Sequence, residues 1–215
     1  PGPYVQDSLI VERSDYPGLE RGELEIKFGG GKLSLFEAHE EWLKGGFYGP
    51  RIRTERSVQG ETLQLGLRQE SYRLPRLVRR MHSDWEIGLS PDLNWEIELD
   101  AGAVKGDLDL SALPVDNFDL NLGAGDLTFA LGDKSESTKV AVKAGASNIT
   151  MLVPENVGVS VAVNGALAST NLNNLGWQKV DGRYFSPDYE DAEAQIDLDL
   201  ELAVGNFSIK VEAVR

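Results

Sequence analysis

Few residues of this chain have a type and spacing that chemistry requires. The chain has 215 residues, no Cys and only two His, His39 and His82. The lack of Cys excludes disulfides, zinc–thiolate sites and Cys nucleophiles. Two isolated imidazoles without a triad order leave little room for a His-based metal or acid–base centre. We therefore predict that His39 lies on a solvated helix face and that His82 belongs to a basic loop.

Two short motifs imitate catalytic signatures without completing them. The sequence GGGK at residues 29–32 lacks the upstream Gly of a phosphate-binding loop, and Leu33 stands where that loop carries a hydroxyl. The sequence GVSVA at residues 158–162 lacks the final Gly of a nucleophile elbow. We read the first as turn glycines followed by an exposed Lys, and Ser160 as a surface residue of a strand.

Carboxylates are abundant but carry no specific pattern. The chain has 35 Asp and Glu against 21 Lys and Arg, a formal net charge of -14, which argues against a nucleic-acid surface. The sequence DLDLS at residues 107–111 resembles the start of a calcium loop, but its leucines are typical of a strand, so diffuse cation screening is favoured over a calcium site. A glycosidase needs two carboxylates about 5–10 Å apart in a cleft, and acid-rich strands supply pairs almost anywhere. We assign no catalytic residue, metal or cofactor.

Two segments remain as candidates for interactions. Residues 51–85 hold eight Arg against four acids and are suited either to an anionic envelope polymer, lipid headgroups or a partner, or to capping an acidic stack. The candidate residues there are Arg51, Arg53, Arg73, Arg76, Arg79 and Arg80. The second segment is an aromatic loop with Trp177, Tyr184 and Tyr189, which is either a binding site or a cover packed over the side of the fold.

The elements that would position these residues repeat along the chain. Five blocks, at 95–110, 118–131, 138–153, 157–169 and 194–211, place a small-residue turn between two runs in which apolar and polar residues alternate. This period of two predicts half-buried strands. The turns recur about every 20–22 residues, with one double gap, and a constant period favours coils stacked in a solenoid over hairpins or a sandwich.

The pattern also predicts a core and three regions of the chain. The core residues are Trp95, Ile97, Leu99, Phe118, Leu120, Phe129, Val140, Val142, Ile149, Val159, Val161, Leu198, Leu200, Phe207 and Ile209. Residues 1–22 are expected to be an extended leader, residues 23–92 an N-terminal segment and residues 93–215 the main solenoid. Within the N-terminal segment, LFEAHEEWLK at 35–44 followed by two glycines predicts a helix with its C-cap.

At its repeats the sequence resembles the bacterial toast-rack domains of extracytoplasmic cell-envelope proteins, which include proteins of the response to cell-wall-active antibiotics and adhesins. The matching series is LEIKFGGGKLSL (24–35), WEIELDAGA (95–103), LNLGAGDLTFAL (120–131), VAVKAGASNITMLVP (140–154), VGVSVAVNGAL (157–167) and IDLDLELAVGNFSI (196–209). The resemblance covers about residues 20–213 and implies an all-β, right-handed solenoid-like stack. The turns at Gly102 and Gly205 depart from the fuller Gly-Ala-Gly pattern of the family.

The resemblance also implies a biological setting. We expect a non-catalytic module of the cell envelope that acts through a protein partner, in envelope-stress sensing or in adhesion. The alternative is a carbohydrate-binding module for envelope glycans, and a polysaccharide-active enzyme ranks third. The sequence begins at Pro1 without an initiator Met, so we expect a signal peptide or membrane anchor to precede it in a longer protein.

Overall fold

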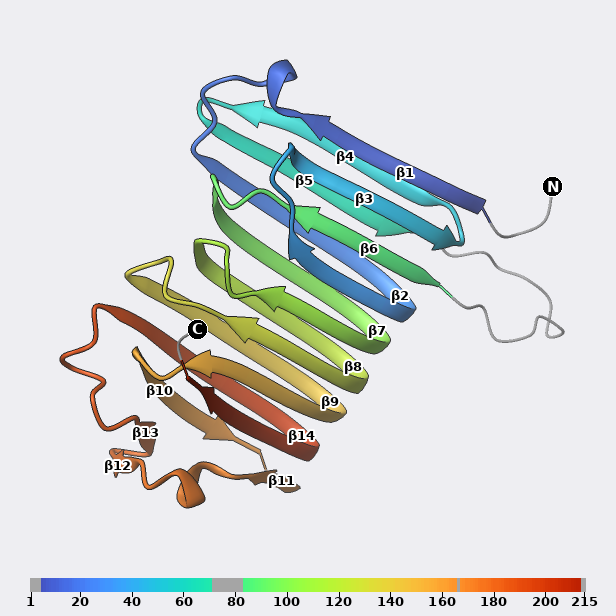
Figure 1. Cartoon of the computed structure of the whole chain (residues 1–215). Coiled ribbons are helices and arrows are strands. Elements are labelled where there is room, and N and C mark those ends of the chain that lie inside the picture. Colours follow the sequence, from blue (N-terminus) through green and yellow to red (C-terminus); the bar gives the residue numbers. More distant parts are fainter. Residues whose placement is uncertain (1–4, 71–82, 166, 214–215) are drawn as a thin grey trace, which may run out of the picture.

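A computed structural model describes residues 5–70, 83–165 and 167–213, and these residues are almost entirely β (Figure 1). One sheet contains all 14 strands of the described residues, in the order β1-β3-β6-β2-β7-β8-β9-β14-β10-β13-β12, with β5 and β4 joined to β2 and β11 joined to β14. The strands are β1 Val5–Glu12, β2 Arg21–Glu37, β3 Glu41–Gly49, β4 Ile52–Gln59, β5 Thr62–Gln69, β6 Asp84–Leu89, β7 Asn94–Leu110, β8 Val115–Leu131, β9 Ser137–Pro154, β10 Val157–Asn164, β11 Leu167–Thr170, β12 Gln178–Val180, β13 Arg183–Phe185 and β14 Ala194–Glu212. The two helices of the described residues are 3-10 turns, Arg13–Asp15 and Leu172–Leu175, and neither is long or apolar enough to cross a membrane. The all-β fold class predicted from the sequence is confirmed.

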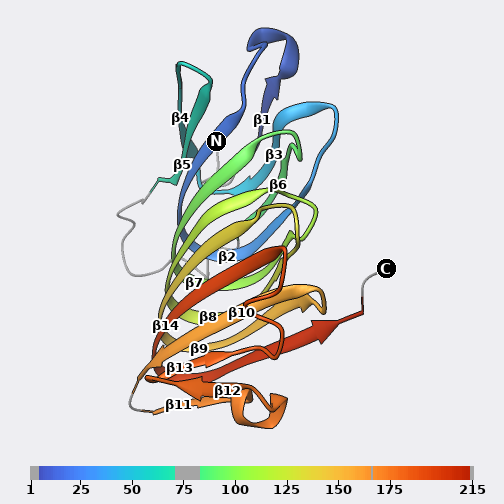
Figure 2. The same ribbon diagram turned by 90° about the vertical axis from the view of Figure 1, so that its left-hand side faces the viewer.

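Five long strands form the centre of the stack. β2, β7, β8, β9 and β14 pair in parallel along most of their lengths. Each strand bends at its glycine turn, so that its two halves face each other like the arms of a U (Figure 2). The rings of Phe118 and Phe129, which lie on opposite halves of β8, approach to 5.4 Å between centroids. The glycines therefore mark bends within single strands, and the repeat is one coil of a stack.

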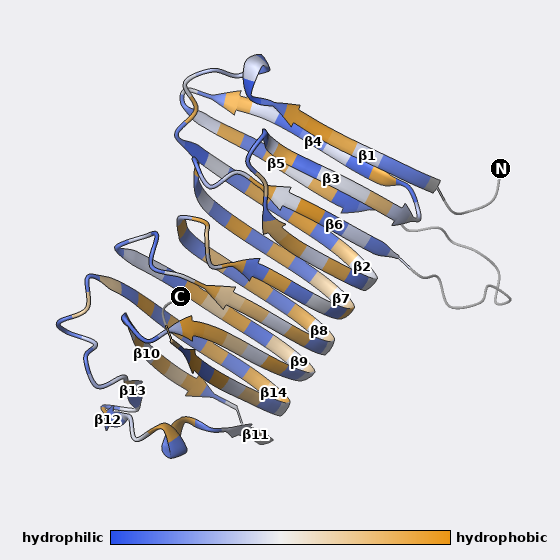
Figure 3. Ribbon diagram, in the orientation of Figure 1, coloured by the Kyte–Doolittle hydropathy of each residue, from blue (hydrophilic) through white to orange (hydrophobic). Residues whose placement is uncertain are grey.

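The core lies between the two halves of these strands. Every residue that the sequence predicts for the core is buried, and apolar and polar residues alternate along the strands (Figure 3). The alternation shifts by one residue at each bend: in β7 the buried positions include Trp95 and Leu99 before the bend, and Leu108 after it. In β8 the same shift occurs at the bend that contains Gly125, whose φ is 146°, a conformation that residues with a Cβ rarely adopt. Because the alternation shifts at the bend, both halves of a strand present leucines and phenylalanines to one core.

A column of glycines allows the coils to stack at the bend. A Cβ on Gly123 would lie 2.5 Å from the carbonyl oxygen of Gly102, and one on Gly145 would lie 2.3 Å from the carbonyl oxygen of Gly123. A Cβ and a nonbonded carbonyl oxygen do not approach this closely in proteins. The spacing of neighbouring coils therefore depends on a glycine hydrogen in place of a methyl group.

The helix predicted at residues 35–44 is wrong. β2 continues to Glu37, three residues turn, and β3 begins at Glu41. Trp42 and Leu43 are buried, and β3 pairs with both β1 and β6. Cross-strand pairing and burial outweigh the helix propensity of this segment, and His39 lies in the turn, not on a helix face. Further along the same segment, the alternating residues Leu63, Leu65 and Leu67 lie in β5, and Trp85, Ile87 and Leu89 lie in β6.

Additional strands extend the stack at both ends. At the N-terminal end β5 and β4 continue one half of β2, and β6, β3 and β1 continue the other half. β1 lies within the segment expected to be a leader and pairs with β3 over its whole length. At the C-terminal end β10, β13 and β12 continue one half of β14, while β11 continues the other. The division of the chain after Gly22 and after Asp92 stays a prediction.

Candidate functional site

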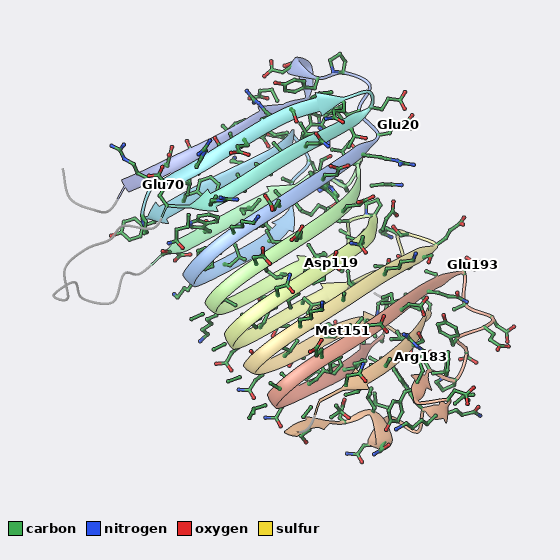
Figure 4. All side chains as sticks on the ribbon, turned by 180° about the vertical axis from the view of Figure 1, so that it is seen from behind. Glu20, Glu70, Asp119, Met151, Arg183 and Glu193 are labelled. Carbon is green, nitrogen blue, oxygen red and sulfur yellow. The ribbon has the colours of Figure 1, made fainter. Side chains whose placement is uncertain are left out.

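The outward faces of the central strands carry many polar side chains (Figure 4), and several of them form hydrogen bonds between neighbouring coils. The amide of Asn121 donates to the Asp100 carboxylate at 2.9 Å, and the amide of Asn148 donates to Asp126 at 2.8 Å. Each bond joins neighbouring coils at the same register position. Such cross-strand pairs stabilise a sheet, so this part of the acidic surface serves the stacking of the coils.

The imitations of catalytic motifs have structural roles. Gly29 lies within β2 at its bend, where its N–H donates to the side-chain oxygen of Gln69 at 2.6 Å. The chain continues as a strand, without the helix whose N-terminus would hold a phosphate.

His39 is exposed and lies 3.5 Å from the Glu37 carboxylate. Within the described residues no three His, Asp or Glu side chains are placed to hold a metal ion.

The basic stretch is only partly within the described residues. Arg51 and Arg53 are exposed at the start of the edge strand β4. Arg53 pairs with Glu55 at 3.2 Å, and the Arg56 guanidinium lies over the Tyr16 ring at 5.5 Å from its centroid. The other four candidates, Arg73, Arg76, Arg79 and Arg80, and also His82, fall within residues 71–82, outside the described residues.

The aromatic loop covers the outer face of β10. Residues 157–161 of this strand are buried at every position. The β12–β13 hairpin, which holds Tyr184, pairs along one edge of β10, and the loop of residues 186–193 brings the Tyr189 backbone and the Ala192 Cβ next to Gly158. Trp177 and Tyr184 pack against the core, and the ring centroids of Tyr189 and Phe185 lie 5.1 Å apart. The structure thus brings the three aromatic candidates to one end of the stack. Their role in binding stays a prediction.

The prediction that Ser160 lies on the surface of a strand is wrong, because its side chain is fully buried. Its hydroxyl donates to the Asp197 carboxylate and accepts a bond of 2.7 Å from the Arg183 guanidinium. The Tyr189 hydroxyl donates to the same carboxylate at 2.7 Å, and Arg183 also pairs with Asp199. This network fastens the hairpin and the loop to β10 and β14.

The network has a measurable electrostatic signature. Burial raises the pKa of the Tyr189 phenol above its usual value, and its hydrogen bond to the Asp197 carboxylate raises it further. Both effects disfavour a phenolate beside a carboxylate. Tyr189 therefore acts as a neutral donor that holds the loop. Within the described residues, the Ser160 hydroxyl has no imidazole partner that could make it a nucleophile.

A cavity of about 780 Å³ lies beside this loop. Its apolar wall includes Trp177 and Val211, and its rim comes from three chain segments: the turn before β9, the turn between β9 and β10, and the loop that leads into β14. The charged lining residues are Asp133, Lys134, Glu136, Glu155, Asp188, Asp191 and Glu193. Asp133 pairs with Lys134 at 3.0 Å, and the Asn156 amide and then Lys134 lower the pKa of its carboxyl.

Sequence reasoning found the aromatic part of this site but not its acids. The acidic run at residues 188–193 is visible in the sequence, but Asp133 and Glu155 lie on separate turns that precede and follow the whole of β9. Only the parallel stacking of β8, β9 and β14 brings the ends of their turns to one side of the fold.

The comparisons with known proteins agree with this fold. A model of the "N-terminal domain of toast_rack, DUF2154" matches residues 1–152. The chain belongs to the toast-rack family. A crystal structure of a "putative cell adhesion protein" from Clostridium sporogenes shares 23% identity with this toast-rack chain and has a TM-score of 0.85, covering 97% of this chain and 100% of that one. A "putative adhesin" from Bacteroides fragilis aligns over 96% of this chain and 97% of its own, with 11% identity and a TM-score of 0.36. No curated protein matches the sequence.

Proposed function

We propose that this toast-rack chain is a non-catalytic module of the bacterial cell envelope that acts through contacts with a protein partner, in envelope-stress sensing or in adhesion. The observation that carries the proposal is membership of the toast-rack family over residues 1–152. The match in fold with the C. sporogenes protein, described as a "putative cell adhesion protein", supports the adhesion branch.

The geometry of the polar groups supports a module without catalysis. The bonded ladders on the strand faces and the Ser160 network use their carboxylates to hold strands together. A rigid stack with exposed edges and end loops is suited to presenting surface to a partner.

A carbohydrate-binding module is the second candidate, because Trp177 stands half-buried beside a cavity of ligand size. Aromatic rings and acidic groups in a pocket are also found where sugars bind. A glycan array distinguishes the candidates: selective binding of a neutral glycan that Trp177→Ala abolishes supports the second candidate and contradicts contact with a protein through this loop.

The proposal is tested in the bacterium that encodes the protein. A photo-crosslinking amino acid is placed singly at Val58, Val180 and Val204, exposed apolar residues on β4, β12 and the bend of β14. We expect the protein in the envelope fraction and one discrete crosslinked protein from at least one position. Recovery only with cytoplasmic proteins, or no crosslinked protein from any of the three positions, contradicts the proposal.

A further inference from the structure

Most of the charged side chains around the cavity beside Trp177 are negative. Asp133 is paired with Lys134, but the other five lining carboxylates make no ion pair within the described residues. They are Glu136, Glu155, Asp188, Asp191 and Glu193. Negative charges around a concave surface make the local electrostatic potential more negative and so attract a cation. A cation bound there relieves repulsion that the fold itself leaves uncompensated.

The apolar wall adds a second recognition element to these charges. Trp177 is half-buried, and its indole N–H makes no hydrogen bond within the described part of the chain. Val211 lines the same cavity with 49% of its surface exposed. An indole face attracts a guanidinium or ammonium group, and the apolar stems of Arg and Lys pack on such surfaces while their heads reach carboxylates.

The rim of the cavity is fixed before any ligand binds. The N–H of Glu155 donates to the carbonyl of Glu212 at 2.9 Å, and the N–H of Gln195 donates to the carbonyl of Glu136 at 2.9 Å. The loop before β14 is held by the N–H of Ser186, which donates to the carbonyl of Val159 at 2.9 Å. Figure 4 marks Glu193 where this loop enters β14. A preorganised rim reduces the entropy that a ligand loses on binding.

We propose that this cavity binds a segment of the protein partner that carries lysine or arginine side chains, an inference that rests on the proposed function and names the chemistry of the partner. Charge complementarity selects a cation, and the indole and Val211 select one with an apolar stem. A cavity of about 780 Å³ lies within the range of about 300–1,000 Å³ typical of ligand pockets, enough for a few side chains. The exposed carboxylates make binding weaken as salt is added.

The test titrates the full chain with N-acetylated, amidated tetralysine and, as controls, with tetraserine and tetraglutamate peptides, followed by calorimetry and tryptophan fluorescence. Trp177 dominates any fluorescence change, because Trp42, Trp85 and Trp95 are buried. We expect tetralysine to bind and to change the fluorescence, and neither control peptide to do so. Trp177→Phe removes the fluorescence change and keeps part of the affinity.

Two triple variants with the same change in net charge separate the cavity from the overall acidity. Asp188→Asn/Asp191→Asn/Glu193→Gln alters the rim, whereas Glu96→Gln/Glu98→Gln/Asp107→Asn alters exposed positions of β7. Each exposed ion pair changes an equilibrium by about 1.4- to 5-fold, so the rim variant weakens tetralysine by about 3- to 100-fold. We expect little change in the β7 variant.

Three outcomes overturn the inference: equal weakening in both triple variants, no preference for tetralysine over tetraserine, or tighter binding of the neutral sugar N-acetylchitotetraose than of tetralysine. The proposed function fails by different results, which are recovery only with cytoplasmic proteins or the absence of a crosslinked protein from all three positions. If a partner is crosslinked but the cavity does not bind tetralysine, only the present inference is contradicted.

Discussion

The close stacking of coils at the glycine bend predicts that one methyl group there destabilises the whole stack. In Gly123→Ala the new Cβ meets the Gly102 carbonyl oxygen at 2.5 Å, whereas real Cβ atoms stay beyond 3.0 Å. β7 and β8 must therefore move apart by several tenths of an ångström near the bend. A hydrogen bond of about 2.9 Å lengthened by that amount lies near the limit of useful geometry.

The magnitude follows from two destabilising effects and one stabilising effect that partly offsets them. Overpacking costs about 1–3 kcal/mol, and weakening one or two ladder bonds costs about 0.5–1.5 kcal/mol each. Replacing Gly by Ala regains about 0.4–1 kcal/mol by restricting the unfolded chain. The free energy of unfolding is expected to fall by about 2–3 kcal/mol, which for a protein of this size lowers Tm by about 4–12 °C.

Gly46→Ala is the matched control. Gly46 lies in strand β3, its φ is not positive, and a Cβ there meets nothing within 4 Å. Urea and thermal unfolding followed by circular dichroism are expected to show Gly46→Ala at or slightly above the wild-type stability, with equal m-values in all three proteins. If Gly123→Ala is as stable as Gly46→Ala, the contact between the glycine and the next coil does not limit the spacing, and the reasoning fails.

Three further predictions concern the C-terminal end of the stack. Arg183→Ala removes the donor that joins the hairpin to β10 and β14, and we expect faster amide exchange in β12 and β13 while β8 is unchanged; equal exchange contradicts a fastening role. Because the pKa of Tyr189 is raised, the neutral phenol favours the folded state. This stability is fully present below the unfolded pKa of about 10 and is lost as pH rises through the folded pKa; Tyr189→Phe should flatten the Tm profile in this alkaline range, and an unchanged profile refutes the assignment. The pKa of Asp133 is lowered. The stability that the Asp133 carboxylate contributes to the fold is therefore present above the unfolded pKa of 3.8 and is lost as pH falls through the folded pKa. Asn156→Ala should raise the pKa of Asp133 in an NMR titration, and no rise means that the amide does not stabilise the carboxylate.

The sequence predicted the central coils well because their code is local. Alternation with a period of two decides which face of a strand is buried, and Trp95, Phe118 and Phe207 follow it without exception. The glycine period decides where each strand bends. These signals need no knowledge of neighbours, since every coil repeats the same pattern.

The ends of the stack were less predictable. Residues 35–44 consist largely of good helix formers, yet the segment forms strands because Trp42 and Leu43 find a core and two partner strands. Ser160 has the pattern of a surface residue and is buried, because a hairpin from later in the chain covers it. Local propensity cannot register a partner that arrives from elsewhere in the chain.

The sequence by itself determined the coil, its buried face, its bend and its acidic exterior. Only the tertiary structure decided which acids act together: Glu136, Glu155 and Glu193 lie far apart in the chain and surround one cavity beside Trp177. The reason is that parallel stacking places the ends of successive coils side by side. Burial of a face is encoded within each strand, whereas the convergence of charges depends on the register between strands.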